Sequence, residues 1–586
     1  MYATVSNQQE QILQKLSKKN RLLSYSRIVL LVTAIYFLYL MMYEKNSTYG
    51  FISLALIAVF VVVVNVYLKT QHKIAYHKAL KQLNTNEINF LNNTYTFNDG
   101  IEYQNPQHAF SYDLDLFGSN SIFQFLNRTN TYLGKEALAN AIQEIPVNEK
   151  IVSKQEAIQE LTHKINFRQH FQTLGLLAGT TATEDLAIKK WSESFTQSPK
   201  KIFSIIAIVL PSLFLFSIIG TVFDLHVVFS KLTVFFFTLN LMVIGYFTQF
   251  ILREIGKSDR ITNSLNQYAK MIEVFEKETF QSHYLIDLQN QLRSNQKSAT
   301  AIVTELANYF EKLNTVANLF VFIALNGTFQ YHFWVYKKLL TWKQKHQQDL
   351  WKFMTVIGEV EALNSLANFA YNNPEYNYPV IEPKQIKFTD LGHPLLSKNK
   401  RVRNDIDFTD KSFVILTGSN MSGKSTFLRT VGINLILSYA GAPIDAKKAV
   451  VCSLPLWVSM RLTDSLSDSE SFFFAEVKRL KQIVNEAEKQ PIFVLLDEIL
   501  KGTNSDDKKS GTIGVIEKIH NLNVTGIIAT HDLEVCKTTE NYPESMENKC
   551  FEVEIVNDEL KFDYKLKNGI CQNKNATFIM KKMEII

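Results

Sequence analysis

Uncharged runs of apolar residues interrupt the first 384 residues of the chain at four places. Residues 28–43 and 50–68 form one close pair of runs, and residues 202–223 and 232–252 form a second pair. A helix that crosses a membrane needs about 20 apolar residues. We therefore expect four transmembrane helices in two hairpins, 28–68 and 202–252. Buried core helices, or a cleaved signal peptide for the first run, explain this paired arrangement less well.

Basic residues indicate how these hairpins are oriented. Lysines and arginines flank the outer ends of both pairs, whereas the two short connections hold only Lys45 and Lys231. The positive-inside rule then places both connections outside and the rest of the chain in the cytoplasm. We expect a multi-pass protein of the inner (cytoplasmic) cell membrane, with the lipid bilayer as a partner and residues 1–27 as a cytoplasmic N-terminal helix.

The segments between and after these runs show the periodicity of amphipathic helices. Residues 69–201 form a cytoplasmic segment, and residues 253–384 a helical core or lever with a recurring apolar stripe. Residues 92–113, rich in Asn, Tyr and Asp, are expected to be mainly loop. A fifth apolar run, 319–325, is only seven residues long and is interpreted as the buried stripe of a soluble helix.

From residue 385 onward the pattern changes to short apolar runs alternating with helical segments. The runs 413–417, 492–496 and 525–529 have the length and composition of fully buried strands. Such alternation is typical of a parallel sheet. The predicted fold class is therefore multi-domain, α plus α/β: two membrane hairpins, a helical core, and a C-terminal domain over 385–586 with a mainly parallel sheet.

Composition changes this picture in only two respects. The mean hydropathy of -0.04 averages strongly apolar runs with a polar body, so it does not exclude a polytopic protein. The net charge of +6 lies entirely in the first 384 residues, which hold 35 basic and 29 acidic residues. Much of that surplus flanks the apolar runs, so it supports the orientation more than a nucleic-acid partner. The four cysteines form no CxxC pair, which excludes a disulfide scaffold or a zinc ribbon.

The first candidate for chemistry follows the run 413–417. The sequence Gly418-Ser-Asn-Met-Ser-Gly-Lys-Ser425 matches the phosphate loop GxxxxGK[ST], with a strand before it and a helix from Thr426 after it. In such loops backbone N–H groups face phosphate oxygens at a helix N-terminus. Lys424 is expected to reach the β- and γ-phosphates and Ser425 to bind Mg²⁺, so ATP and Mg²⁺ are the predicted cofactors.

Two further strand ends carry polar residues. Asp497 and Glu498 follow the run 492–496, and His531 follows the run 525–529 after Thr530. We expect Asp497 to bind magnesium with Ser425, Glu498 to polarise the attacking water, and His531 to hydrogen-bond the γ-phosphate. Glu498 and His531 are thus the catalytic candidates of an ATP hydrolase. A solvated acid for Glu498 and a core histidine for His531 are the structural alternatives.

Three stretches resemble the ATPase domain of the MutS family of DNA mismatch-repair proteins, a branch of the ABC ATPases: residues 417–446, 495–505 and 529–534. Gly392-His393-Pro394, residues 464–477 and the segment from Tyr564 to Gly569 are also similar to family motifs. Residues 117–134 resemble the start of the family's helical core. The similarity is strong over 385–586, moderate over about 110–175 and 253–384, and absent over 1–90.

The resemblance implies a dimer that binds ATP at the subunit interface. It assigns the nucleotide contacts within one subunit to Gly418, Ser419, Asn420, Met421, Ser422, Gly423, Lys424, Ser425 and Thr426. Ser471 would approach the γ-phosphate in trans. The chain departs from the family pattern at three places: Ser422 replaces a glycine, Phe472 a threonine, and Leu500-Lys501 a Gly-Arg pair.

The family's mismatch-reading domain, with its Phe-x-Glu wedge, has no expected counterpart, since the first hairpin takes its place; no C-terminal nuclease domain is expected either. The resemblance therefore implies a membrane-anchored, MutS-like ATPase, homodimeric, that couples ATP hydrolysis to binding of mismatched or non-specific duplex DNA. Two alternatives remain: an ATP-driven mechanotransducer or ABC-type transport ATPase without DNA, and a scaffold that binds ATP but hydrolyses it slowly.

Overall fold

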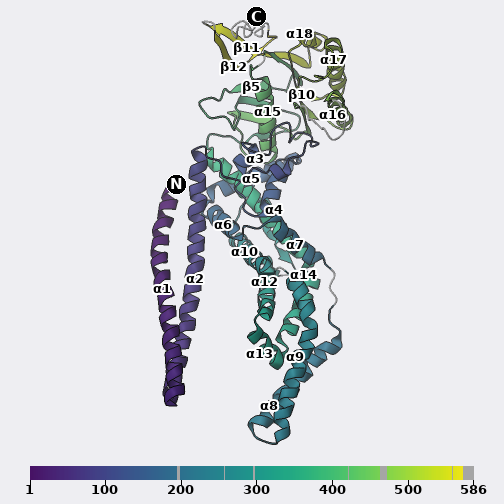
Figure 1. Ribbon diagram of the computed structural model, residues 1–586. Helices are drawn as coiled ribbons and strands as arrows, with labels where there is room; N and C mark the ends of the chain where they lie inside the picture. The colour runs from purple at the N-terminus through teal and green to yellow at the C-terminus, as the bar shows by residue number, and fades with distance from the viewer. Residues whose placement is uncertain are drawn as a thin grey trace.

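The molecule is elongated, with an α/β part at one end and long helices leading away from it (Figure 1). In the computed structural model the described residues are 1–194, 198–256, 258–294, 297–419, 421–461, 472–556 and 559–571. Both helical hairpins predicted from the apolar runs are present as pairs of neighbouring helices; their insertion in a membrane stays a prediction.

Among the described residues, four helices are long and apolar enough to cross a membrane: α1 (Tyr2–Glu44), α2 (Ser47–Leu91), α8 (Lys201–Val222) and α9 (Val227–Ile255). α1 packs along α2 and α8 along α9. Lys45, in the left-handed conformation, ends α1, and the Asn46 side chain caps α2 by accepting a hydrogen bond from Thr48 N. The expected N-terminal helix over 1–27 is continuous with the first apolar run, because α1 has no break.

A bundle of helices lies between the α8–α9 pair and the α/β part, and α1 and α2 run alongside this bundle (Figure 1). It contains α3 (Ile122–Leu126), α4 (Tyr132–Ala141), α5 (Asn148–His163), α6 (Ile165–Ala178), α7 (Ala182–Glu193), α10 (Ser258–Lys277), α11 (His283–Gln291), α12 (Ala299–Asn314), α13 (Leu319–Phe329) and α14 (Tyr331–Asn372). α14 runs the length of the bundle and packs against α4, α5 and α12. The segment predicted to be helical, 253–384, is mainly helical up to Asn372, and β3 (Val380–Ile381) lies in its last residues. A short hairpin, β1 (Arg293–Ser294) and β2 (Lys297–Ser298), lies between α11 and α12. Residues 92–113 are mainly loop, as predicted, with one 3₁₀ turn at Ile101–Tyr103.

The prediction of a buried stripe at 319–325 is wrong. Leu319 and Phe320 of α13 are 66% and 85% exposed, and Ile323 is exposed as well. The reason is the location of α13, which lies against α9 and α8 rather than inside the helical bundle. One side of this apolar helix is therefore uncovered.

The α/β part contains a six-stranded sheet in the order β12-β11-β6-β10-β9-β8. Its strands are β6 (Phe413–Gly418), β8 (Leu456–Ser459), β9 (Phe493–Asp497), β10 (Thr525–Thr530), β11 (Met546–Val556) and β12 (Glu559–Asn568). All neighbouring pairs are parallel except β11 and β12, so the predicted mainly parallel sheet is confirmed. β6 and β9 are buried at every position, as their apolar runs predicted.

Helices and a smaller sheet surround this sheet. The helices are α15 (Lys424–Tyr439), α16 (Phe472–Ala487), α17 (Ser505–Asn521), α18 (Leu533–Cys536) and α19 (Thr538–Asn541). The smaller sheet has the order β3-β7-β4-β5, with β3 (Val380–Ile381), β4 (Lys387–Leu391), β5 (Asn404–Asp407) and β7 (Lys448–Val451). Because β9, β10 and β6 are parallel neighbours, their carboxyl ends meet at one edge of the large sheet.

Candidate active site

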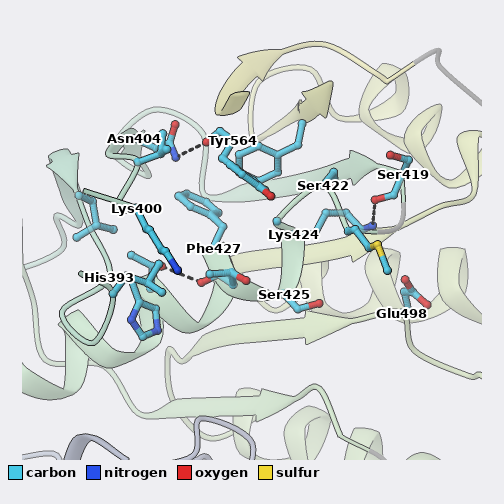
Figure 2. Close-up of a pocket in the computed structure, with 18 residues that line it drawn as sticks. His393, Lys400, Asn404, Ser419, Ser422, Lys424, Ser425, Phe427, Glu498 and Tyr564 are labelled. Carbon is cyan, nitrogen blue, oxygen red and sulfur yellow. Dashed lines mark hydrogen bonds between the residues drawn. The ribbon is translucent and has the colours of Figure 1, made fainter. Parts of the chain in front are cut away.

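A cavity of about 680 Å³ lies at this carboxyl edge, between the loop after β6 and the smaller sheet. Figure 2 shows the side chains that line it. Of the residues predicted from the phosphate-loop motif, those on its walls are Ser419, Met421, Ser422, Gly423, Lys424, Ser425 and Thr426. The cavity therefore collects the loop predicted from sequence at the start of α15, where the helix N-terminus favours an anion.

Two glycines give the loop its shape. Gly418 and Gly423 have φ values of 156° and 104°. A Cβ on Gly418 would lie 2.5 Å from Ser422 Oγ and 2.9 Å from the carbonyl oxygen of Phe551, so no larger residue fits there. Met421 also has a positive φ, of 65°, and its side chain is 81% exposed. Asn420 lies outside the described residues.

Lys424 is buried at the first position of α15. Its ammonium donates hydrogen bonds to the carbonyl oxygens of Gly418 (2.9 Å) and Ser419 (3.3 Å), which folds the side chain back over the loop (Figure 2). Burial lowers the pKa of Lys424, and the carboxylates of Glu498 and Asp497 act in the opposite direction. The lysine therefore places a positive charge directly beside the loop that would receive phosphates.

Ser425 and Asp497 form the pair expected to bind a divalent cation. Ser425 Oγ donates a hydrogen bond of 2.5 Å to Asp497 Oδ2. Asp497 Oδ1 is buried and has no hydrogen-bond partner among the described residues. A carboxylate oxygen left unpaired beside a hydroxyl is a hard-oxygen donor set of the kind that Mg²⁺ prefers. These residues therefore fit a magnesium ion, although the assignment of each ligand remains a prediction.

Glu498 and His531 meet across the ends of β9 and β10. His531 Nε2 lies 2.5 Å from Glu498 Oε1 and 3.2 Å from Lys424 Nζ. The hydrogen bond with His531 is the main reason why the pKa of Glu498 falls to about 2; its half-buried position opposes this shift. Glu498 has a left-handed backbone, with φ of 48°, which is rare for a residue with a side chain. Glu498 thus lines the cavity, and His531, which does not line it, contacts both Glu498 and Lys424.

The far end of the cavity was not predicted as part of the site. Leu391, Lys400, Asn404, Phe427 and Tyr564 line it together with His393. Tyr564 stacks on Phe562 with ring centroids 5.7 Å apart. Burial, aided by Arg401 and Arg429, lowers the pKa of His393 to about 4, so the imidazole is neutral near pH 7. The rings of Phe427 and Tyr564, together with the neutral imidazole of His393, suit an aromatic ring, and Lys400 adds a positive charge to this end of the cavity. Only the family-like motif at 392–394 and the segment from Tyr564 gave a signal for it in the sequence.

The cavity is tied to the helical bundle through the loop before α3. Asp113 accepts hydrogen bonds from the backbone N–H groups of Met460 (2.8 Å) and Arg461 (2.9 Å). Arg479 of α16 donates to the carbonyl oxygens of His108 (2.9 Å) and Ala109 (2.5 Å). Ser471 and the first part of the family-like loop 464–477 follow these contacts directly but lie outside the described residues.

Comparison with known proteins agrees with this geometry. Residues 414–584 match the family model of MutS domain V. The chain is 30% identical over 234 residues to the DNA mismatch repair protein MutS of Thermotoga neapolitana, and the match covers 39% of this chain and 29% of that protein. It is 28% identical over 301 residues to human MutS protein homolog 4, covering 46% of this chain and 31% of that protein.

A third relative is the DNA mismatch repair protein MutS of Ehrlichia chaffeensis, 33% identical over 230 residues, with 38% of this chain and 28% of that protein covered. The chain thus spans less than a third of the length of these curated relatives. The similarity and the site coincide in the α/β part that contains the phosphate loop. Residues 414–584, the C-terminal part of the chain, are therefore similar to domain V of the MutS family.

Proposed function

We propose that the chain is a membrane-anchored ATPase of the MutS type that binds ATP with Mg²⁺ in the cavity at the carboxyl edge of β6, β9 and β10. The observation that carries the proposal is the meeting of Lys424, the Ser425–Asp497 pair and the Glu498–His531 pair at that edge. Phosphoryl transfer to water requires a phosphate-binding loop, ligands for a divalent cation and a carboxylate that aligns the water. The type of ATPase, within the ABC branch, is part of this proposal.

Each residue has a defined task in this reaction. Lys424 and the N–H groups at the start of α15 bind the phosphates, and Ser425 and Asp497 hold Mg²⁺. When bound, the ion neutralises charge on the phosphate oxygens. Glu498, ionised because of its low pKa, accepts a hydrogen bond from the attacking water and aligns it. His531 keeps the carboxylate in place and can turn its Nε2 to the γ-phosphate.

A homodimer and a bilayer complete the proposal. Met421 exposes an apolar side chain at the tip of the phosphate loop, which supports a second subunit covering the loop and contributing Ser471 in trans. The apolar side chains of α1, α2, α8 and α9 are mostly exposed, as expected of helices whose solvent is lipid. The location would be the inner (cytoplasmic) membrane, with the ATPase part in the cytoplasm.

DNA is the proposed partner of the ATP cycle, because two of the relatives described above carry the name DNA mismatch repair protein. Closure of the dimer would then move the helical bundle around a duplex. The charge of residues 253–384 gives little support to binding of a duplex, because this segment contains 14 basic and 13 acidic residues. Duplex binding usually relies on a basic surface.

That near-neutral charge favours a second candidate, an ATPase that moves its membrane hairpins without DNA. α14 is one unbroken helix of 42 residues and α2 one of 45 residues, and both could transmit a movement along the molecule (Figure 1). In this version the same site and dimer drive a mechanical or transport-related change in the membrane.

The test is ATP turnover by the full-length protein in detergent, with and without duplex DNA. Glu498→Gln should reduce turnover at least a hundredfold, because the amide cannot align the water as a carboxylate does. The matched control, Glu544→Gln, changes an exposed acid outside the cavity and should leave turnover unaltered. Equal turnover in wild type and Glu498→Gln would refute the catalytic assignment. Stimulation by duplex DNA that disappears at high salt supports the first candidate, and its absence supports the second.

A further inference from the structure

α13 has an uncovered apolar side, which is not expected of a helix in a bundle surrounded by water. Leu319, Phe320 and Phe329 are 66%, 85% and 54% exposed, and the helix has no charged residue. Apolar side chains of this size, exposed together, mark a surface that contacts something other than water. The neighbours of α13 indicate what that is.

α13 contacts α9 near its middle. A Cβ on Gly327 would lie 2.2 Å from the ring of Phe237, so the two helices are in close contact there. Asn240 Nδ2 donates to the carbonyl oxygen of Gly327 (3.1 Å). The cytoplasmic end of α9 is marked by Glu254, which accepts a hydrogen bond from Trp191 of α7. Asn240 lies 14 residues before Glu254, which corresponds to about 21 Å along a helix.

Polar side chains form hydrogen bonds around the turn between α13 and α14. Gln330, with a left-handed φ of 53°, donates from Nε2 to the backbone oxygen of Asn240 (2.7 Å). Asn326 accepts from His332 N (3.0 Å), and the imidazole of His332 lies 3.0 Å from Thr315 Oγ1. Asn240, Asn326, Gln330 and His332 are all fully buried. Of the side-chain N and O atoms of these four residues, only Oε1 of Gln330 is buried without a hydrogen-bond partner among the described residues. A non-helical turn at membrane depth is tolerated when nearly all of its polar groups are satisfied within the protein in this way.

We infer that α12, α13 and the first turns of α14 form a re-entrant hairpin that enters the membrane from the cytoplasmic side beside α8 and α9, with α13 in contact with lipid acyl chains. The inference rests on the proposed membrane anchoring. Asn240, about 21 Å along α9 from its cytoplasmic end, lies inside a hydrocarbon core that is about 30 Å thick. The side chains of Leu319 and Phe320 are then exposed to lipid rather than to water.

Cysteine labelling of the full-length protein in sealed inside-out membrane vesicles, whose cytoplasmic face is accessible to the reagent, tests this depth. The native cysteines are all buried, so their background reaction is small. Phe320→Cys should react with a membrane-impermeant maleimide at least tenfold more slowly than Val152→Cys on the exposed surface of α5, and as slowly as Ile208→Cys on α8. A fluorophore attached to the new thiol of the Phe320→Cys variant should also be quenched by lipids brominated on their acyl chains.

The outcomes separate this inference from membrane anchoring. Fast labelling of Phe320→Cys with a protected Ile208→Cys overturns the re-entrant hairpin and leaves anchoring intact. Fast labelling at both positions overturns both. Protection of Phe320→Cys without quenching by brominated lipids also overturns the inference, because a second protein surface would then cover α13.

A separate observation carries a second inference, about a cavity of about 280 Å³ between α12 and α14. Four lysines line it, on β2 and on one face of α14: Lys297, Lys337, Lys338 and Lys345. Its one lining carboxylate, Glu305, accepts a hydrogen bond from Tyr309 (2.6 Å). Among the described residues, no carboxylate lies within ion-pair distance of Lys297, Lys338 or Lys345.

This basic cavity lies level with the cytoplasmic ends of α8 and α9. Lys337 Nζ donates to Ser204 Oγ near the start of α8 (2.9 Å), and Lys343, on the next turns of α14, lies 3.8 Å from Glu254. Trp334 and Tyr309 also line the cavity, and aromatic rings are enriched at this level of membranes. We propose that the cavity binds the phosphate headgroup of an anionic phospholipid of the cytoplasmic leaflet.

The test compares lipids added to the detergent-purified full-length protein. Phosphatidylglycerol should raise the midpoint of thermal unfolding relative to phosphatidylcholine, and Lys338→Gln/Lys345→Gln should remove at least half of that rise. The control Lys69→Gln/Lys73→Gln removes the same charge beside the second membrane helix but outside the cavity, and should retain the rise. An equal loss in both double variants, or an equal rise with free glycerol phosphate, overturns a headgroup site.

Discussion

His531 Nε2 lies between two charged groups of the site, 2.5 Å from Glu498 Oε1 and 3.2 Å from Lys424 Nζ. One nitrogen cannot serve both at once: with a proton it donates to the carboxylate, and without one it accepts from the ammonium. Whether Nε2 carries the proton therefore decides whether His531 hydrogen-bonds to Glu498 or to Lys424. This relationship joins the ends of β9 and β10 to the phosphate loop.

Replacing His531 should release Glu498. In His531→Ala the pKa of Glu498 should rise from about 2 toward its ordinary value near 4.5, because the hydrogen bond that lowers it is gone. We expect kcat to fall about tenfold to a hundredfold while nucleotide affinity stays within about threefold. Steady-state kinetics and binding of a fluorescent ATP analogue measure the two quantities. A loss confined to nucleotide affinity would contradict a catalytic role.

The same pair predicts a pH dependence of stability. Because the folded pKa of Glu498 lies below its unfolded value, its stabilising contribution is present above about pH 4.5 and is lost as pH falls toward 2. The difference in thermal midpoint between wild type and Glu498→Gln should therefore shrink over that acidic range and be constant above it. A difference that is unchanged between pH 5 and pH 3 would contradict the hydrogen bond between His531 and Glu498.

The unpaired Oδ1 of Asp497 predicts a magnesium-specific defect. Asp497→Asn keeps an oxygen that can accept the Ser425 hydroxyl but removes the charge. Mg²⁺ should raise the nucleotide affinity of the wild type by a factor at least ten times larger than that of the variant, a difference of about 1.4 kcal/mol in binding free energy. Nucleotide affinity in the presence of EDTA should be the same for both. Titration of a fluorescent ATP analogue against Mg²⁺ measures this. Asp506→Asn, at the exposed start of α17, is the matched control; an equal defect there would refute the assignment.

The strands of this site could be predicted because each is determined by the apolar pattern of consecutive residues. β6, β9 and β10 are short, mostly apolar strands that are buried at every position except Thr525, the partly buried first residue of β10. Their observed bounds differ from the predicted ones by at most one residue at each end. The polar residues that follow such parallel strands necessarily gather at one edge. The loop, Asp497, Glu498 and His531 therefore come together without any knowledge of distant contacts.

The depth of α13 and the far end of the cavity could not be predicted, because neither has a local signal. The run 319–325 is equally compatible with a protein core and with lipid. The contacts that favour lipid are made just after the run, by Gly327 and Gln330 with Asn240 of α9, 87 and 90 residues away. Similarly, Lys400 lies in no recognisable motif, and the family-like stretch 417–446 gave no sign that Phe427 would line the site; both reach the cavity where the smaller sheet and α15 meet.

Arg479 should hold the α/β part on the helical bundle. Its guanidinium is mostly buried and donates to the carbonyl oxygens of His108, Ala109 and Val458. Arg479→Lys keeps the charge but cannot reach several acceptors at once, which costs about 2 kcal/mol. We expect the thermal midpoint to fall by about 4 °C or more. The exposed Arg293→Lys should change it by less than about 1 °C; equal effects would contradict this anchor.

A buried carboxyl group in the helical bundle predicts the opposite pH trend to that of Glu498. Glu361 of α14 accepts hydrogen bonds from Asn130 N (2.9 Å) and from the backbone and hydroxyl of Thr131, and complete burial raises its pKa to about 7, with a smaller contribution from Asp185. As pH rises, the unfolded chain releases the Glu361 proton near pH 4.5, whereas the folded state keeps this proton up to about pH 7. Stability contributed by this proton is present below about pH 4.5 and is lost as pH rises to 7, by about 3 kcal/mol.

Glu361→Gln should remove this trend, because the amide is neutral at every pH. The thermal midpoint of the wild type should fall relative to that of the variant between pH 5 and pH 7 and run parallel to it above pH 8. Glu359→Gln, two residues earlier and bonded to Tyr284 at a partly exposed position, serves as the control and should keep the wild-type trend. Parallel curves for wild type and Glu361→Gln from pH 5 upward would show that the carboxyl group is already ionised in the folded bundle. In that case the donors from Asn130 and Thr131, rather than burial, would determine its charge.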